Sequence, residues 1–262
     1  MILTTTPDNQ LGICIVPKSS STTWAHAFGH MNNIKHEDTP DQVSNVYVRV
    51  ASSPIISKQA STYYDVQKLN DVAKFKFIFV RHPFERLGSY FHWIFDPPGV
   101  KYSPLALQAI VDYENKSKGD TKTDTMESIT FSRFVDFVLH EASSLGENDM
   151  ISHLTAHWWP YTETCRVCLV TYDFVGHLET FGDDAQILAD KFPSNSVLKK
   201  IGNSKRLGCK GSCKADKLVS RYLEEYKQLK KESIKQLYRF FKNDFEFGGY
   251  DYPHYYIENG IS

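Results

Sequence analysis

The chain reads CIVPKSSSTTW over residues 14–24, and this stretch carries its sharpest structural signal. An apolar run ends at Pro17, a short polar loop follows, and apolar residues recur at helical spacing from Trp24 onward. This order predicts a buried strand, a loop and then a helix whose N-cap is Ser21 or Thr22. The first turn of such a helix presents backbone N–H groups and a positive dipole end, so we expect an anion to bind there.

The side chains of the loop suit the same anion. Lys18 adds a mobile positive charge, and the hydroxyl groups add neutral donors. The loop is not a GxxxxGK[ST] nucleotide loop, because it lacks the glycines and its lysine precedes the turn. The alternative is a helix cap rich in serine and threonine beside a solvated lysine. The candidate anion-binding residues are Pro17, Lys18, Ser19, Ser20, Ser21, Thr22 and Thr23.

A second strand, charged turn and helix start occur over residues 79–90, which read FVRHPFERLGSY. Arg81 stands where the strand ends, and Ser89 follows about two turns into the helix. Ligands of open parallel sheets bind at the carboxyl edge of the strands, so two such turns predict one ligand with two separated anionic groups. The alternative for Arg81 and Arg86 is a structural salt bridge with Glu85 or a contact with a helix end.

Strands alternate with helices along the chain, which predicts a parallel sheet with helices on both faces. We therefore expect a single α/β domain over residues 11–252, with a surface insertion at 96–128 and tails at 1–10 and 253–262. The expected strands are Leu11–Val16, Val46–Val50, Lys76–Val80 and Leu169–Val175. The expected helices begin at Ser21, Tyr63, Pro83, Phe131, Leu178 and Leu218, the last running to Phe241.

Composition excludes several classes of protein. Thirty Lys and Arg face thirty-one Asp and Glu, so a global field that attracts nucleic acid is not expected. No run of about 18 apolar residues occurs, which predicts no membrane-spanning helix. Residues 1–10 lack the basic and apolar regions of a signal peptide.

The five cysteines leave alternatives open. Cys165 and Cys168 form C-x-x-C, and Cys209 and Cys213 form C-x-x-x-C. These four are compatible with two disulfides, a four-thiolate zinc site or free thiols. Cys14 lies within an apolar run.

The two turn segments resemble those with which sulfotransferases bind the sulfate donor PAPS (3′-phosphoadenylyl sulfate). PKSSSTTW at 17–24 resembles the loop for the 5′-phosphosulfate, and FIFVRHPFERLGSYF at 77–91 resembles the 3′-phosphate site, with Arg81 and Ser89 as its ligands. Further segments resemble the Golgi carbohydrate sulfotransferases that include the chondroitin and dermatan 4-O-sulfotransferases. They are HWWP at 157–160, CRVC at 165–168, YDFVGHLET at 172–180 and DFEFGGY at 244–250.

This resemblance, over about residues 12–252, implies a P-loop-like sulfotransferase fold and a function. The expected reaction moves the sulfuryl group of PAPS to a sugar hydroxyl of an anionic, chondroitin-like glycan, without a metal. The implied place is the Golgi lumen, with membrane attachment only through an anchor that this sequence lacks, and Asn115 begins a glycosylation sequon. The alternative is a catalytically inactive PAPS- or glycan-binding protein of the same fold.

The resemblance also suggests roles for individual residues. Lys18 is expected to neutralise the bridging oxygen of the donor, and His157 is the candidate general base, because histidine titrates near neutral pH. The alternative for His157 is a packed structural residue or a sugar contact. Asn203 and Ser204 are expected near the donor, within the basic stretch 199–221.

In the compartment that the resemblance implies, the cysteines are expected to form disulfides. Local pairs, Cys165–Cys168 and Cys209–Cys213, and crossed pairs stay open, with Cys14 as a buried free thiol. The chain departs from the 4-O-sulfotransferases at three places: their loop reads PKVACTNW, His82 replaces an acidic residue, and an extra glycine precedes Tyr250. These departures leave open which sugar is sulfated.

Overall fold

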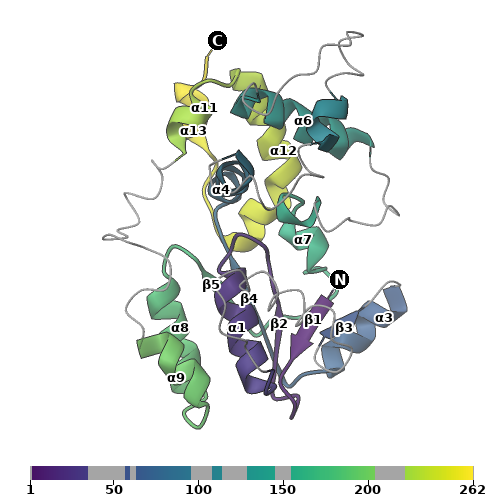
Figure 1. The fold of residues 1–262 in the computed structure, drawn as a ribbon, viewed down its shortest axis with the longest axis vertical. Coiled ribbons are helices and arrows are strands. Elements are labelled where there is room, and N and C mark those ends of the chain that lie inside the picture. The colour runs from purple at the N-terminus through teal and green to yellow at the C-terminus, as the bar shows by residue number, and fades with distance from the viewer. Residues whose placement is uncertain are drawn as a thin grey trace. The chain divides into compact units, whose positions relative to one another are not determined.

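The protein is an α/β protein in a computed structural model that describes residues 2–34, 57–59, 63–95, 108–113, 129–144, 155–203 and 222–261. The chain forms two compact units (Figure 1). Unit 1 comprises Met1–Arg81 and Tyr161–Ala215, and unit 2 comprises His82–Pro160 and Asp216–Ser262. Within the described ranges, no helix has both the length and the hydropathy needed to cross a membrane.

Unit 1 contains a five-stranded sheet of order β3-β1-β2-β4-β5. The strands β2, β4 and β5 are parallel, as predicted, while β1 runs antiparallel to both β2 and β3. The short connection between β1 and β2 explains why these two strands are antiparallel, because only antiparallel strands can be joined by a tight turn. The strand bounds are β1 (Ile2–Thr5), β2 (Leu11–Cys14), β3 (Ser57–Gln59), β4 (Phe75–Val80) and β5 (Phe174–His177).

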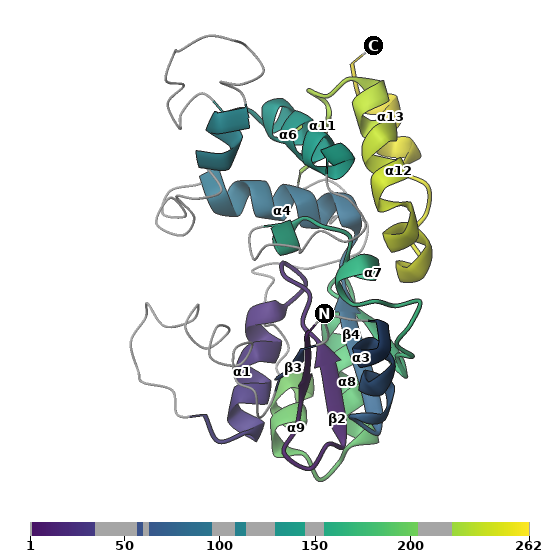
Figure 2. The same ribbon diagram turned by 90° about the vertical axis from the view of Figure 1, so that its right-hand side faces the viewer.

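Helices cover both faces of this sheet (Figure 2). On one face, Trp24 of α1 (Ser21–Met31) packs against Phe77 and Phe79 of β4, with ring centroids 4.9 and 4.8 Å away. The helices α8 (Phe181–Lys191) and α9 (Ser196–Asn203) complete this apolar layer. The helix α3 (Tyr63–Lys68) and the 3₁₀ turn η2 (Leu69–Asp71) lie on the opposite side of the sheet from α1. The α/β class predicted from the sequence is confirmed.

Several predicted elements have different bounds. The strand expected at Leu169–Val175 begins only at Phe174, because Leu169 and Val170 pack in a small cluster with Leu3 and Val66 without joining the sheet. The segments expected as tails contain β1 and α13 (His254–Asn259). The expected long C-terminal helix is divided into α11 (Leu223–Tyr226) and α12 (Lys231–Gly248). The strand expected at Val46–Val50 lies outside the described residues, as does most of the 96–128 insertion.

Unit 2 is helical and has its own apolar core. Pro83 opens α4 (Pro83–Phe95), where proline suits the first helical turn. Phe84 stacks on Tyr226 at 4.9 Å, and the Tyr226 hydroxyl donates to the Phe84 carbonyl. The unit also contains α6 (Phe131–Ser144), the 3₁₀ turn η5 (Thr155–His157), α11, α12 and α13.

The cysteine pairing differs from every predicted arrangement within the described chain. Cys14, the last residue of β2, forms a disulfide with Cys165, which follows α7 (Tyr161–Thr164). Cys168 is free and exposed, so the expected Cys165–Cys168 pair and the free Cys14 thiol are wrong. The fold of unit 1 brings together two cysteines 151 residues apart, which local spacing cannot indicate. Cys209 and Cys213 lie outside the described residues.

Candidate functional site

The loop after β2 has a strained backbone. Lys18 and Ser20 adopt left-handed conformations, with φ of 67° and 58°. Such conformations cost roughly 1–3 kcal/mol each for residues with a side chain and cluster at functional sites. The Trp24 N–H donates to the Ser20 carbonyl, so α1 begins at Ser21 with Ser20 as its N-cap, slightly earlier than predicted. The turn thereby directs Lys18 and the start of α1 to the same edge of the sheet.

This loop offers donors to an anion. Ser21, Thr22 and Thr23 form the first turn of α1, where backbone N–H groups have no acceptor within the helix. Ser19 is only 1% exposed, and in the described part of the chain its hydroxyl has no hydrogen-bond partner. A buried hydroxyl without a partner is unfavourable, and a bound oxyanion would satisfy it. Both observations fit a phosphate or sulfate ester.

Two positive side chains meet at this loop. The strands β2 and β4 are parallel neighbours, with Cys14 beside Ile78, so the residues that follow them lie at one edge. Arg81 is 6% exposed, and its Nη1 lies 3.5 Å from the Lys18 carbonyl oxygen, to which it donates. Burial, together with the positive charge of Arg81, lowers the pKa of Lys18 to about 7. A bound anion relieves this repulsion, so the loop and Arg81 together fit an anionic ligand.

The other predicted residues divide between the two units. Ser89 lies on α4 and His157 ends η5, both in unit 2. Asn203 is the exposed last residue of α9 in unit 1, and Ser204 lies outside the described residues. The structure therefore brings Lys18 and Arg81 together within unit 1, and it describes Ser89 and His157 within unit 2 only.

His157 belongs to a stack of aromatic rings in unit 2. Its imidazole is nearly parallel to the rings of Tyr90 and Trp93, with centroids 5.2 and 5.3 Å away. The neighbouring Trp158 is 3% exposed and packs in the core, so it does not offer its ring to a sugar. Within the segment 157–158, the His157 side chain is half-buried, whereas that of Trp158 is buried.

Two residues of the second motif have contacts that the sequence did not reveal. Arg86 is 1% exposed, and its Nη2 donates to the carbonyl oxygens of Ala156 and Trp159, at 3.1 and 2.9 Å. His82 packs against four aromatic rings, including Tyr256, on which it stacks at 5.6 Å. The burial of α4 was predictable from its apolar stripe, but these partners come from distant parts of the chain.

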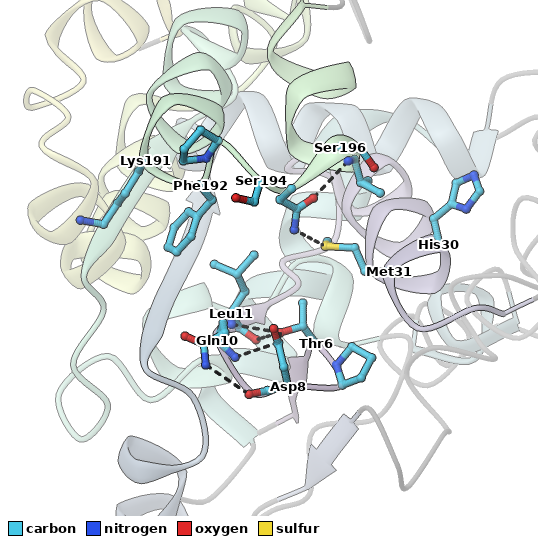
Figure 3. Close-up of a pocket in the computed structure, with 14 residues that line it drawn as sticks. Thr6, Asp8, Gln10, Leu11, His30, Met31, Lys191, Phe192, Ser194 and Ser196 are labelled. Carbon is cyan, nitrogen blue, oxygen red and sulfur yellow. Dashed lines mark hydrogen bonds between the residues drawn. The ribbon is translucent and has the colours of Figure 1, made fainter.

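A separate cavity of about 660 Å³ lies at the amino end of β2 (Figure 3). It is lined by the β1–β2 turn, the end of α1 and the α8–α9 connection, including Asp8, His30 and Lys191. None of the predicted site residues lines it. It adjoins Leu11 at the start of β2, whereas the loop of Lys18 follows the other end of the strand. The cavity is therefore distinct from the anion-binding loop.

The fold and the loop define an α/β protein with a strand–loop–helix turn whose donor groups fit a phosphate or sulfate ester. The sequence profile of the Sulfotransferase family matches residues 2–252. The chain belongs to this family.

Individual relatives are carbohydrate sulfotransferases. The chain is 25% identical to carbohydrate sulfotransferase 11 of Rattus norvegicus over 252 residues, which cover 95% of this chain and 66% of the relative. It is 28% identical to carbohydrate sulfotransferase 8 of Homo sapiens over 173 residues, 66% of this chain and 38% of the relative. The chain thus spans less than two thirds of the length of these relatives. No solved structure matches it significantly.

Proposed function

We propose that this protein is a carbohydrate O-sulfotransferase that takes its sulfuryl group from PAPS. The observation that carries the proposal is the half-buried Lys18 and the buried Arg81 beside the first turn of α1, which fit an anionic ester. Family membership and the carbohydrate sulfotransferases among the relatives support the same reading.

The residues of the loop would act through position and charge. Sulfuryl transfer resembles phosphoryl transfer, in which attacking and leaving oxygens lie roughly in line and charge develops on the leaving group. PAPS supplies the activated sulfuryl group. Lys18 and the N–H groups of Ser21 to Thr23 would stabilise the charge that develops on the 5′-phosphate, while Arg81 and Ser89 would hold the 3′-phosphate.

His157 is the proposed general base. An acceptor hydroxyl must lose its proton as it attacks, and a neutral imidazole accepts one near physiological pH. Burial raises the pKa of Tyr90, its stacking partner, so that phenol keeps its proton and does not compete for this role. In this proposal His157, and not Tyr90, would take the proton of the acceptor hydroxyl.

The proposed acceptor is an anionic glycan of the chondroitin type. The basic residues of 199–221 favour a negatively charged polymer over a neutral one. The proposed place of action is the Golgi lumen, where the disulfide Cys14–Cys165 would persist. No nucleic acid and no metal enter this proposal.

Two measurements test the function. Calorimetry should show that adenosine 3′,5′-bisphosphate binds more tightly than ATP, and a preference for ATP would overturn the proposal. Labelled sulfate from PAPS should then appear in at least one member of a panel of desulfated glycans. Tight donor binding without transfer to any member would identify an inactive binding protein instead.

The substitution Arg81→Gln should weaken binding of adenosine 3′,5′-bisphosphate about 10- to 100-fold. A hydrogen bond to a charged group contributes roughly 1.5–3 kcal/mol, and each 1.4 kcal/mol corresponds to a tenfold change. Calorimetry measures the effect, and Arg239→Gln, at an exposed arginine of α12, is the matched control. Equal affinities of the two variants would exclude Arg81 from the donor site.

Donor binding should also take up a proton. The pKa of free Lys18 is about 7, and a bound anion favours its charged form and raises that pKa. Below pH 7 the lysine is charged in both states, so affinity for adenosine 3′,5′-bisphosphate is constant there. Above about pH 7 it must be protonated on binding, so affinity falls as pH rises.

Calorimetry at about pH 8 in two buffers of different ionisation enthalpy measures this uptake. The binding enthalpy of wild type should depend on the buffer, and that of Lys18→Met should depend on it less. A wild-type enthalpy independent of buffer would show that Lys18 does not titrate at the site.

A further inference from the structure

One face of α4 supports the segment that carries His157. Arg86, Tyr90 and Trp93 are spaced by four and three residues, so their side chains follow one another along the same side of the helix. Arg86 bonds the main chain of the segment, while Tyr90 and Trp93 stack on its imidazole. We define these three residues as the α4 platform. All of them lie in unit 2 with His157.

The contacts of Arg86 bracket His157. Its Nη2 donates to the carbonyl of Ala156, immediately before the histidine, and to that of Trp159, two residues after it. A single nitrogen thus bridges both sides of the turn. Because Arg86 is 1% exposed, water cannot readily replace it, and losing it would leave two carbonyl groups without this donor.

The rings of the platform set the plane of the imidazole. The Trp93 ring lies within 9° of parallel to His157 and the Tyr90 ring within 20°. These faces also attract the positive charge that forms when the imidazole accepts a proton. Arg86 is permanently charged and faces main-chain oxygens, so it can anchor the turn without itself exchanging a proton.

We propose that Arg86 is a positioning residue that acts through His157, by holding the 156–159 turn so that the imidazole stays stacked on Tyr90 and Trp93. This inference rests on the proposed role of His157 as the base. Arg86 itself does not contact the reacting atoms in this proposal. Small displacements of a catalytic group can cost about 100-fold in rate, so removing the anchor should lower turnover more than donor affinity.

A double-mutant cycle tests the kinetic part. Arg86→Met should lower kcat for glycan sulfation roughly 10- to 100-fold while leaving KM for PAPS nearly unchanged. In a His157→Ala background, the same substitution should cause little further loss, because its target is already gone. If Arg86→Met lowered kcat by the same factor in the wild-type and His157→Ala backgrounds, the proposal would be overturned. Arg86→Lys, which keeps the charge but not the planar fork, should retain more activity than Arg86→Met.

Nuclear magnetic resonance tests the positioning without any turnover. The ring protons of His157, assigned by their loss in His157→Asn, should show upfield ring-current shifts in wild type. These shifts should diminish in Arg86→Met and Arg86→Lys and persist in Arg239→Met, the exposed-arginine control. Unchanged His157 signals in a folded Arg86→Lys protein would overturn the inference, even if Arg86→Met unfolds.

The two assays separate two kinds of failure. If wild type sulfates no glycan but its His157 signals respond to Arg86, the proposed function fails and the positioning stands. If wild type is active and the His157 signals and the cycle do not respond, the positioning fails and the function stands.

Discussion

Replacing Lys18 by methionine should lower the rate of sulfate transfer about 100- to 1000-fold, the usual effect of removing one donor that stabilises charge in a transition state. Methionine keeps an unbranched stem and removes the charge beside Arg81. Turnover of labelled PAPS with an accepted glycan measures the effect. The loss should appear mainly in kcat, because the charge of the leaving group develops during the chemical step.

The stability of this variant separates a catalytic loss from misfolding. The fold lowers the pKa of Lys18 from 10.5 to about 7, which means that folding disfavours its charged form. Removing the charge should therefore leave the thermal midpoint unchanged or raise it at pH 7 and below, and the gain should shrink as pH rises. Lys74→Met, at an exposed lysine beside β4, is the control. A Lys18→Met rate close to that of wild type would refute the proposed role.

Removing the Cys14–Cys165 disulfide should have the largest effect on stability. The bond closes a loop with a sequence separation of 151 residues, and losing such a constraint costs roughly 2–5 kcal/mol of unfolding free energy. Chemical denaturation of the Cys14→Ala/Cys165→Ala variant measures the loss. The loop with Lys18 begins just after Cys14, so donor binding should weaken before the protein unfolds globally.

Cys168→Ala is the matched control, because this thiol is exposed and free in the described structure. Its stability should lie within about 0.5 kcal/mol of wild type, as for most surface substitutions. A reducing agent should lower the thermal midpoint of wild type and leave that of the double alanine variant unchanged. A midpoint of wild type that does not respond to reduction would contradict a stabilising Cys14–Cys165 bond.

The sequence predicted the parts of the fold whose signals are local. The end of β2 and the start of α1 were predicted within two residues, because an apolar run, a polar loop and a helical stripe follow one another directly. Arg81 was placed correctly at the end of β4 for the same reason. By contrast, the strand predicted at Leu169–Val175 begins only at Phe174, since periodicity cannot distinguish an apolar turn packed against the core from a buried strand.

The residues alone determined two strand–turn–helix segments with the composition expected of anion-binding turns, because the positive charges, the hydroxyl groups and the helix starts occupy consecutive positions. Only the tertiary structure decided that Cys14 pairs with Cys165, that burial and the neighbouring Arg81 lower the pKa of Lys18, and that Arg86 bonds the turn of His157. The physical reason is distance along the chain. Each of these contacts joins positions more than 60 residues apart, which only the packing of strands and helices brings together.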